Sequence, residues 1–307
     1  MYNIMKNYKL IFEDLIKGTQ EYLEKNHLFS MVLGISGGLD STVTAAICHE
    51  VEKRNPEIKF YGVSLPCSSN KDVENDSASV CMKAFCKAGQ YWTENLQKEY
   101  LLMRATCTQR HLPTTIGQGN IKARLRMIYL YDLANFTNGL VMDTDNLTEH
   151  YLGFYTIHGD QGDLNPIGNL WKHEVYELAN YLLREYYKLP DPTDNGYIQM
   201  ALRAAIGIMP TDGNGVNALG DMGQIAPGFA HDDNIEAYKK VDDIISKYLY
   251  AAAQFPNERD KIIKELETKY NIDTEEKTED IVSEVISRVK RTEYKRKLLP
   301  VKIKLNN

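Results

Sequence analysis

Residues 29–41 read FSMVLGISGGLDS and carry the strongest local signal in the chain. The first seven form a short, mostly apolar run with β-branched members, which is typical of a buried strand in a parallel sheet. A Gly-Gly pair ends this run, and residues 40–52 have helical character. The stretch therefore predicts a strand, a glycine-rich turn and a helix in direct succession.

The segments around this unit continue the alternation of strands and helices. Near-helical spacing of Leu10, Ile11, Leu15, Tyr22 and Leu23 predicts a helix at 8–27. Further strands are expected at 58–66, 90–96 and 139–143, and further helices at 72–87 and 120–136. This alternation predicts an α/β fold, a doubly wound, Rossmann-like parallel sheet with flanking helices.

The second half of the chain is less regular. A helix is expected at 172–187, and the Gly-, Pro-, Asp- and Asn-rich stretch at 190–230 predicts a long loop or mobile element. Residues 235–250 and 277–291 are expected to be surface helices joined by a charged, polar segment. We expect a single domain over 1–307, with a core at about 28–190, a lid at about 190–230 and a C-terminal helical part at about 232–307.

Composition excludes several classes of protein. Of 307 residues, 42 are acidic and 36 basic, and a net charge of −6 gives no support to nucleic-acid binding. The five cysteines form no CxxC pair, which predicts reduced thiols. No apolar run is long enough for a membrane span, and the N-terminus lacks the pattern of a signal peptide. We therefore expect a soluble, cytoplasmic protein.

The residue types in the glycine-rich turn suit phosphate binding. Gly37 and Gly38 let the backbone approach an anion, and the following helix N-terminus offers N–H groups to it. Ser36 and Ser41 add hydroxyl donors. Asp40 would repel phosphates unless it holds Mg²⁺, which prefers oxygen ligands. The turn is not a Walker A loop, and the alternative is a simple turn with Ser and Asp as helix caps; the full string after an apolar strand favours a nucleotide site.

The string SGGLDS at 36–41 resembles the SGGxDS signature of the ATP-pyrophosphatase group. The resemblance implies the adenine nucleotide alpha hydrolase-like version of the fold. It also implies cleavage of ATP between the α- and β-phosphates, with transfer of AMP to an acceptor oxygen. Several kinds of synthetase and tRNA-modifying enzyme share this signature, so the turn alone does not identify the acceptor.

The string GNIKARLRM at 119–127 resembles a helix of NAD synthetases almost residue for residue. On a helix, Lys122 and Arg126 share a face that would present two cations to phosphates; the alternative is a solvated basic face. The resemblance implies that Arg126, with Gly34 of the strand, binds ATP. It implies that Asn120, Arg124 and Phe154 bind deamido-NAD.

The string VMDTDN at 141–146 resembles the family strand that ends in GTDN, with Asp143 in place of the usual glycine. The resemblance implies that Thr144 contacts ATP and that Glu149 joins Asp40 as a second Mg²⁺ ligand. Two carboxylates at the ends of neighbouring strands can share a hydrated Mg²⁺, so the chemistry of the residues agrees. The alternative is an acidic turn with an asparagine cap.

The string GDQGDLNPIGNLWK at 159–172 is similar to the family's GDGGADLLPIGDLYK. The resemblance implies that Asp160 lies near the ammonia site, that Asp163 holds the nicotinate end of deamido-NAD and that Lys172 binds ATP phosphates. Gln161 replaces a glycine, one residue is missing, and Ile157 stands where the family usually has lysine. These departures concern the acceptor pocket rather than the ATP site.

Elsewhere the resemblance is fainter. It implies ATP contacts for Asn70, in place of a family glutamine that reads adenine, and for Thr211, at the start of the family's lid. The EYKR string at 293–296 is similar to the family's EHKR, which implies that Tyr294 and Lys295 bind deamido-NAD. In the family this end packs across a homodimer interface and reaches the partner subunit's site.

These features predict an ammonia-dependent NAD synthetase activity, an AMP-forming carbon–nitrogen ligase in which ATP adenylates deamido-NAD and Mg²⁺ is the cofactor. Free ammonia is the expected donor because no glutaminase domain precedes the turn in this sequence. Two alternatives stay open: another ATP-pyrophosphatase with a different acceptor, and a non-catalytic nucleotide-binding relative. The acidic charge and lack of paired cysteines argue against tRNA thiolation.

Overall fold

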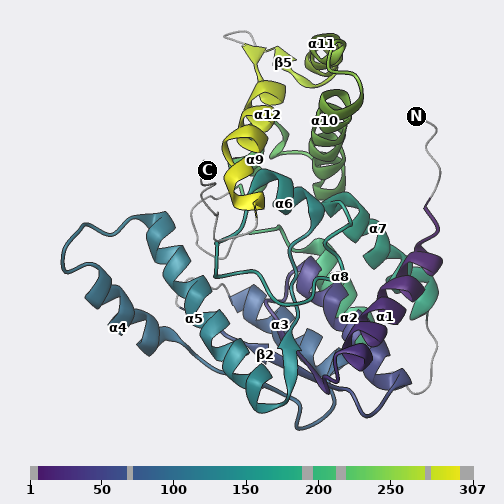
Figure 1. Cartoon of the computed structure of the whole chain (residues 1–307), viewed down its shortest axis with the longest axis vertical. Coiled ribbons are helices and arrows are strands. Elements are labelled where there is room, and N and C mark those ends of the chain that lie inside the picture. Colours follow the sequence, from purple (N-terminus) through teal and green to yellow (C-terminus); the bar gives the residue numbers. More distant parts are fainter. Residues whose placement is uncertain (1–5, 68–71, 189–195, 212–218, 274–277, 298–307) are drawn as a thin grey trace, which may run out of the picture.

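The computed structural model describes residues 6–67, 72–188, 196–211, 219–273 and 278–297. Its centre is a parallel sheet in the order β3-β2-β1-β4 (Figure 1). The strands are β1 Ser30–Gly34, β2 Lys59–Ser64, β3 Tyr91–Thr93 and β4 Gly139–Val141. Because the chain builds outward from β1 in both directions, the carboxyl ends of β1 and β4 flank the switch point where α/β proteins bind ligands. The predicted α/β class is confirmed.

Side chains alternate along the central strand, and each face of the sheet has its own helices. Met31 and Leu33 of β1 belong to the larger buried cluster, with residues of α1 Tyr8–Lys25, α2 Leu39–Arg54, α3 Asp72–Phe85 and α7 Lys172–Tyr181. Val32 points the other way and packs with Val63, Val141 and residues of α5 Thr115–Phe136. A strand buried on both faces explains the continuous apolar run at 29–35.

The buried face of α1 differs from the prediction. Leu10 and Tyr22 are exposed, whereas Phe12, Ile16 and Leu23 are buried against the sheet layer. The helix itself forms as expected, because both sets of residues have helical spacing. Packing against α2 and α7 selects which set faces inward.

One pair of helices stands away from the body. The sequence did not predict α4 Gln97–Cys107, which packs against α5 and forms with it an arm at the left of Figure 1. The arm has exposed apolar side chains, including Leu102 at 64% and Leu112 at 87% exposed. We call α4, α5 and the residues between them the helical arm.

The prediction of a long loop at 190–230 is wrong for much of that stretch. It contains α8 Tyr197–Gly207, α9 Met222–Ile225 and a 3₁₀ turn at Pro227–Phe229. Ala201, Leu202 and Ala205 are buried where α8 packs against α2, α3 and α7. The surrounding Gly, Pro and Asn residues concealed an amphipathic helix. Residues 189–195 and 212–218 of the expected lid lie outside the described residues.

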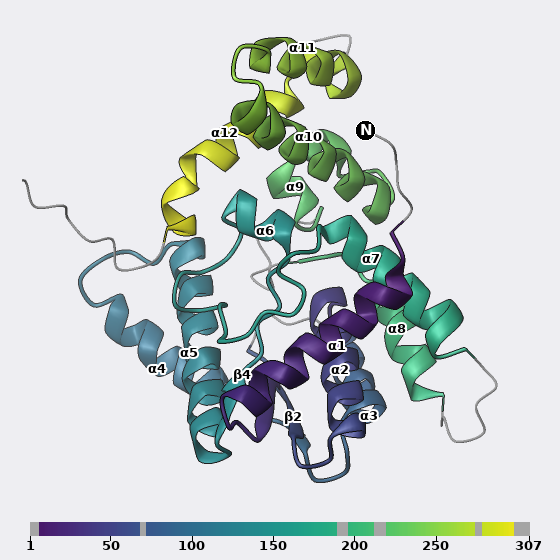
Figure 2. The same ribbon diagram turned by 45° about the vertical axis from the view of Figure 1, so that its right-hand side comes forward.

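The C-terminal part is a helical layer over α6 Leu147–Leu152 and α7 (Figure 2). It consists of α10 Asn234–Gln254, α11 Arg259–Tyr270, a two-stranded pair (β5 Ile272–Asp273, β6 Thr278–Glu279), α12 Ile281–Arg291 and a 3₁₀ turn, η3, at Glu293–Arg296. The segment expected to be a charged link thus contains α11. The helix predicted at 172–187 is α7 followed by the π-helical turn η1, Leu182–Tyr186.

Two further predictions concern the chain as a whole. All five cysteines are unpaired, and four of them are buried. Within the described part of the chain, no helix combines the length and apolar character needed to cross a membrane.

Candidate active site

A cavity of about 790 Å³ opens at the carboxyl ends of β1 and β4. Its walls come from the turn after β1, from α5, from the segment between β4 and residue 160, and from the C-terminal residues around α12. The volume lies in the upper part of the range of small-molecule sites. Segments far apart in the sequence therefore meet at the switch point of the sheet.

The turn after β1 has a shape that only glycine allows. Gly37 has a φ of 83°, and a Cβ there would lie 2.6 Å from both the Glu74 carbonyl oxygen and the Ala78 nitrogen of α3. Ser77 Oγ donates to the Gly37 carbonyl at 2.7 Å and holds the turn against α3. Gly38 is the N-cap of α2, so the first N–H groups of a 16-residue helix face the cavity. The N–H groups at a helix N-terminus are suited to bind an anion.

The two serines of the turn hold its shape. Ser41 Oγ donates to the Gly38 carbonyl at 3.1 Å, and Ser36 Oγ lies 3.0 Å from Ser41 Oγ and accepts from Gly38 N at 3.2 Å. Both serines line the cavity, as does Gly34, whereas Gly37 contributes the bend. The turn therefore lies in the wall of the cavity, and its binding of a nucleotide stays a prediction.

Lys172 lies between two carboxylates. Its Nζ donates to Asp40 Oδ2 and lies 3.3 Å from Glu149 Oε1. The lysine side chain is only 4% exposed. Burial lowers the pKa of Lys172, but the two carboxylates outweigh it and leave that pKa well above its ordinary value. Burial raises the pKa of Glu149 to about 8, although Lys172 lowers it. We call these three residues the charged triad.

Asn146 fixes both carboxylates of the triad. Its Nδ2 donates to Asp40 Oδ1 at 3.0 Å, and its Oδ1 accepts from Glu149 N at 3.1 Å. Glu149 Oε2 accepts a hydrogen bond from Asn146 N at 3.1 Å, which completes a capping box at the start of α6. The sequence string TDN followed by Glu149 thus encodes the start of a helix.

A second set of contacts lies behind the triad. Asp242 of α10 is 2% exposed, and its carboxylate accepts from Thr148 Oγ1 at 2.5 Å and from His173 Nδ1 at 2.7 Å. Thr148 Oγ1 in turn accepts from Lys172 N at 2.8 Å. One buried carboxylate therefore links α10 to the neighbours of both Glu149 and Lys172. Asp242 was not among the residues selected from the sequence.

Two aspartates, Asp143 and Asp145, lie in the segment after β4. Asp143, which replaces the family's glycine, accepts from Asp145 N at 2.7 Å and from Gly162 N at 3.0 Å, so it ties the strand end to the next loop. Burial raises the pKa of Asp143 to about 6. Asp145 lines the cavity, and burial followed by repulsion from Asp143 and Glu149 raises its pKa well above the ordinary value. The sequence analysis did not select Asp145, although it is part of the TDN string.

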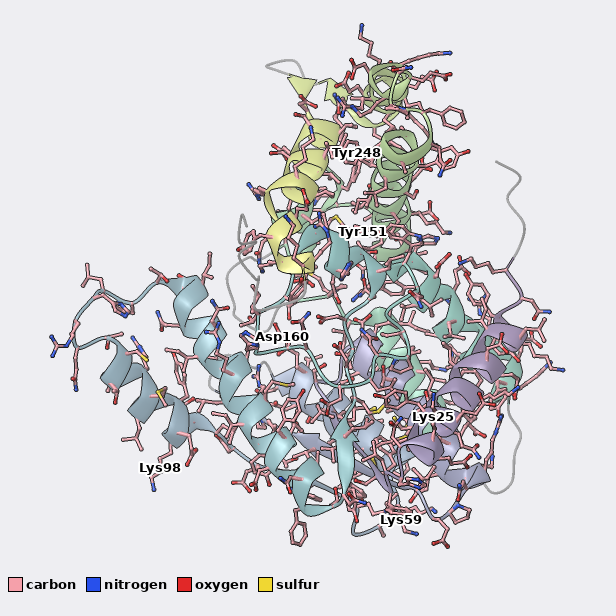
Figure 3. The ribbon with its side chains drawn as sticks, viewed as in Figure 1. Lys25, Lys59, Lys98, Tyr151, Asp160 and Tyr248 are labelled. Atoms are coloured by element: carbon pink, nitrogen blue, oxygen red, sulfur yellow. The ribbon has the colours of Figure 1, made fainter. Side chains whose placement is uncertain are left out.

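Asp160 lies on the loop between α6 and α7, in the middle of the molecule (Figure 3). Its Oδ2 accepts from Thr156 N at 2.5 Å, and the residue lines the cavity. Burial raises the pKa of Asp160, whereas Arg126 and Lys295 lower it. The predicted catalytic carboxylate is therefore close to two cations of the cavity wall.

The basic helix α5 contributes differently from the expected pair of cations. Asn120, Arg124 and Arg126 line the cavity, and Arg126 Nε donates to the Leu65 carbonyl at 3.0 Å. Lys122 is buried, lies 5.0 Å over the ring of Tyr100, and is not among the described residues that line the cavity. The expectation that Lys122 faces phosphates beside Arg126 is wrong, because α4 covers that part of the helix.

Asp163 lies away from the cavity, where the sequence analysis expected it to hold the acceptor. Its carboxylate accepts from Val141 N at 2.9 Å and from Tyr131 Oη at 3.1 Å, so it extends the edge of β4. It is absent from the described lining of the cavity. The shortened loop at 159–163 keeps the aspartate in the string but turns it toward the strand. Among the described residues, Asp163 therefore contacts β4 and α5 and does not line the cavity.

The other predicted residues are accounted for as follows. Thr144, Phe154 and Thr211 line the cavity, and Thr211 Oγ1 donates to Glu74 Oε1 at 2.9 Å. Asn70 lies outside the described residues.

Tyr294 and Lys295 line the cavity of their own chain. Lys295 Nζ donates to the carbonyls of Gly153 and Tyr155 at 2.7 and 2.6 Å. Gly153 has a φ of 59°, and a Cβ there would lie 2.5 Å from Thr292 Cβ, so a glycine lets the 3₁₀ turn pack closely. The sequence-based expectation placed this end on a partner subunit's site. In the single chain it completes the chain's own cavity.

Arg288 of α12 also lines the cavity and was not selected from the sequence. In the sequence, this position is marked by no more than a cation at the border of the apolar helix face formed by Val285 and Val289. Tyr151, on α6, lies at the foot of α12 (Figure 3), where Thr292 Oγ1 donates to its carbonyl at 3.3 Å.

Fold and site together define a nucleotide-binding α/β protein with an anion-binding turn at its switch point and a lysine–carboxylate centre beside it. A family model described as NAD synthase matches residues 11–190. The chain belongs to the NAD synthase family, a family of ATP-dependent amidating ligases.

Curated relatives agree with this family. The NH(3)-dependent NAD(+) synthetase of Carboxydothermus hydrogenoformans is 37% identical over 179 residues, which cover 57% of this chain and 71% of that protein. The protein of the same name from Campylobacter jejuni subsp. doylei is 34% identical over 178 residues, 57% of this chain and 68% of that one.

Two solved structures share the fold over nearly the whole chain. The NMN synthetase from Francisella tularensis has a TM-score of 0.70 at 21% identity, covering 97% of this chain and 99% of that one. The NH3-dependent NAD synthetase from Campylobacter jejuni subsp. jejuni has a TM-score of 0.63 at 22% identity, covering 97% and 100%. At these identities the likeness shows a common fold.

Proposed function

We propose that the chain is an ammonia-dependent NAD synthetase, which adenylates the nicotinate carboxylate of deamido-NAD with ATP and then amidates it. The products are NAD, AMP and pyrophosphate. The observation that carries the proposal is the arrangement around one cavity of the anion-binding turn, the charged triad and Asp160.

In the first step, an oxygen of the nicotinate carboxylate attacks the α-phosphorus of ATP. The P–O bond to the β-phosphate breaks, and pyrophosphate leaves with the bonding electrons. The N–H groups at the start of α2 are positioned to bind the departing phosphates. Lys172 provides a fixed, desolvated positive charge beside them, where such a charge is most effective.

The chemistry of the residues fits a Mg²⁺ ion. Asp40 and Glu149 already converge on one cation, the Lys172 ammonium, and carboxylates that also leave room for phosphate oxygens are typical of Mg²⁺ sites. Among the described residues, no group of three or more acidic, His or Cys side chains forms a larger metal site. Mg²⁺ held by Asp40 and Glu149 would neutralise charge on the ATP phosphates.

In the second step, ammonia attacks the carbonyl carbon of the adenylate, and AMP leaves. The attacking nitrogen becomes positively charged and must lose a proton. Asp160 is suited to accept that proton, because it lines the cavity and burial raises the pKa of its carboxyl group. Arg126 and Lys295 lower the pKa of Asp160 and so oppose part of the effect of burial.

A second acceptor of the same chemistry is nicotinate mononucleotide. It is favoured by the similarity of fold, over 97% of the chain, to the NMN synthetase from Francisella tularensis. The two acceptors share the nicotinate, its ribose and the attached phosphate, so the mechanism above is the same for both. Deamido-NAD is our first choice because the curated relatives at 34–37% identity are named NAD synthetases.

The test supplies the purified chain with ATP, MgCl₂, ammonium chloride and either acceptor, and measures NAD or NMN together with AMP and pyrophosphate. We expect NAD and AMP in equal amounts without added glutamine. Much faster formation of NMN than of NAD would identify nicotinate mononucleotide, and not deamido-NAD, as the acceptor. Bound ATP with no AMP from either acceptor would contradict the proposal and favour a non-catalytic protein.

The expected homodimer remains a prediction. The exposed apolar side chains of the helical arm, with Leu101, Leu102 and Ile116 among them, offer a surface on which a second copy can pack. Cytoplasmic location also remains a prediction.

A further inference from the structure

Asp143 lies just beyond β4, beside the cavity but outside its wall. The residue is 7% exposed and is not among the described residues that line the cavity, although its neighbours Met142 and Thr144 are. A buried carboxylate in such a place needs hydrogen-bond donors from the protein itself. The partners of Asp143 therefore indicate what it holds in position.

The two carboxylate oxygens of Asp143 bond to two different segments. Oδ1 accepts from Asp145 N at 2.7 Å, which closes a turn over residues 143–145. Oδ2 accepts from Gly162 N at 3.0 Å, in the loop that precedes α7. Asn165 Nδ2 also donates to Oδ1, at 3.2 Å. One carboxylate group thus joins the end of β4 to the segment 162–165.

Gly162 lies directly against the end of β4. A Cβ at this position would be 2.7 Å from the Val141 carbonyl oxygen and 2.8 Å from Asp143 N, both of them backbone atoms. On either side of the contact, Asp143 N donates to the Leu164 carbonyl at 2.9 Å and Asp163 N donates to the Val141 carbonyl at 2.8 Å. The loop is therefore fixed to the strand end at this point, and the close approach requires a glycine.

Asp160 lies two residues before Gly162, in the middle of the molecule (Figure 3). A turn holds it from the other side, because Asp160 N donates to the Thr156 carbonyl at 3.2 Å and Thr156 N donates to Asp160 Oδ2 at 2.5 Å. Thr156 Oγ1 donates in turn to Asn120 Oδ1 of α5 at 2.9 Å. The loop that carries Asp160 is thus anchored at two points, to α5 through Thr156 and to β4 through Gly162 and Asp143.

The anchor at β4 involves the residues in which this chain departs from the NAD synthetase strings. Asp143 and Gln161 each stand where those strings have glycine, and the loop at 159–166 is one residue shorter. In the structure the two departures are neighbours, because Asp143 accepts from the N–H group of the residue that directly follows Gln161. Glycine at position 143 would leave that N–H group without the carboxylate. The contact is therefore a property of this chain's own sequence.

We propose that Asp143 is a positioning residue for the amidation step, which fixes Asp160 at the place where ammonia attacks the adenylate. The inference rests on the proposed function, since it needs Asp160 to accept the proton of the attacking nitrogen. Asp143 acts through the Gly162 N–H group and not through a substrate. Because a displacement of about 1 Å can cost about 100-fold in rate, one buried hydrogen bond is sufficient for this role.

The test variant is Asp143→Asn, which keeps an oxygen for Asp145 N but turns an NH₂ group toward Gly162 N. Adenylation is measured alone, as acceptor-dependent exchange of labelled pyrophosphate into ATP without ammonium. At pH 8, above the Asp143 pKa of about 6, we expect exchange within about threefold of wild type and kcat/KM for ammonium about 10- to 100-fold lower. AMP should exceed NAD, because water attacks the adenylate that ammonia leaves unused and releases AMP and the free acceptor carboxylate.

Asp233→Asn is the matched control. Asp233 makes the same bond to the N–H group two residues on, at 3.0 Å from Ile235 N, but it is exposed at the start of α10 and does not line the cavity. It should leave exchange, ammonium kinetics and the ratio of NAD to AMP unchanged. Asp143→Ala, which removes both bonds, should also give less NAD than AMP and supplies the same ratio if thermal unfolding shows that Asp143→Asn is not folded.

A double-mutant cycle tests whether Asp143 acts through Asp160. In an Asp160→Asn background, Asp143→Asn should lower kcat/KM for ammonium no further, and an undiminished further loss would overturn the inference. It would also be overturned if exchange in Asp143→Asn fell as far as the ammonium kinetics, or if NAD and AMP stayed equal with wild-type ammonium kinetics. If wild type itself shows neither exchange nor an amidated product with either acceptor, the proposed function fails instead.

Discussion

At the N-terminal end of α6, Lys172 lies between two carboxylates. At the C-terminal end of the same helix, the partners of Arg288 and Lys295 among the described residues are backbone carbonyls and aromatic rings. The three side chains of the charged triad hold one another in place, because Asp40 and Glu149 both contact the Lys172 ammonium and Asn146 bonds to both carboxylate groups. Arg288 and Lys295 line the cavity, and none of the ion pairs among the described residues includes them. In the proposed function, the charged triad at the N-terminal end of α6 acts on ATP, and the residues at the C-terminal end of α6 lie on the side of the acceptor.

Replacing Lys172 should have the largest effect on the first region. Lys172→Met removes the charge beside the phosphates, and we expect the rate of AMP formation to fall about 100- to 1,000-fold with little change in acceptor KM. Steady-state kinetics with saturating and limiting acceptor separate the two quantities. Lys239→Met, which removes a lysine from surface pairs with Glu177 and Glu236, is the control and should leave the rate unchanged.

An equal fall in kcat in Lys172→Met and Lys239→Met would contradict a specific role of Lys172 in AMP formation. A rise in acceptor KM in Lys172→Met of about 10-fold or more would contradict the assignment of Lys172 to the ATP phosphates.

Replacing Asp242 should have a smaller effect on the same region. Asp242→Asn disturbs the contacts to Thr148 and His173 that support the backbone beside Glu149 and Lys172. We expect kcat to fall about tenfold, acceptor KM to stay constant and stability to fall by about 1 to 3 kcal/mol. Kinetics and thermal unfolding measure these quantities.

The neighbouring Asp243→Asn is the matched control. Asp243 bonds to Lys247, Lys269 and Tyr270, away from the triad. It should lower stability without lowering kcat. Equal kcat losses in the two variants would mean that Asp242 acts on the fold and not on the position of the triad.

The smallest expected effect concerns pH and the balance of the triad. Because the pKa of Glu149 is about 8 in the folded chain and near 4.5 when unfolded, the folded state holds the proton more tightly. Its contribution to stability is complete below about pH 4.5 and is lost as pH rises to about 8. Glu149→Gln cannot titrate, so its stability relative to wild type should increase over this window.

Thermal unfolding of both proteins from pH 5 to 8, with EDTA and without nucleotides, measures this difference. The slope for one proton is at most about 1.4 kcal/mol per pH unit. A difference that stays constant with pH would contradict the raised pKa of Glu149.

Sequence reasoning recovered the parts of the site that are local in the chain. The apolar strand and the Gly-Gly turn are each set by a few neighbouring residues, so the local sequence predicts them. The capping box before Glu149 is local too, but the sequence analysis gives an asparagine cap only as the alternative to a ligand site. The parallel sheet followed from the repeated alternation of such units. Helix α8 escaped because its amphipathic pattern lies among turn-forming residues.

What sequence reasoning missed depends on long-range packing. Lys122 and Arg126 are one turn apart, but α4, which was not predicted, covers only the first. Arg288 reaches the cavity because α12 crosses the end of α6, a contact between residues more than 130 positions apart. No local pattern distinguishes such an arginine from a solvated one.

The central claim is that the acceptor carboxylate is activated by transfer of AMP. Deamido-NAD labelled with ¹⁸O in the nicotinate carboxylate tests this claim most directly, by mass spectrometry of the products after turnover with ATP, MgCl₂ and ammonium. The account predicts one ¹⁸O in the phosphate of AMP and none in pyrophosphate. Label in inorganic phosphate, with ADP as the other product, would contradict it and indicate an acyl phosphate instead.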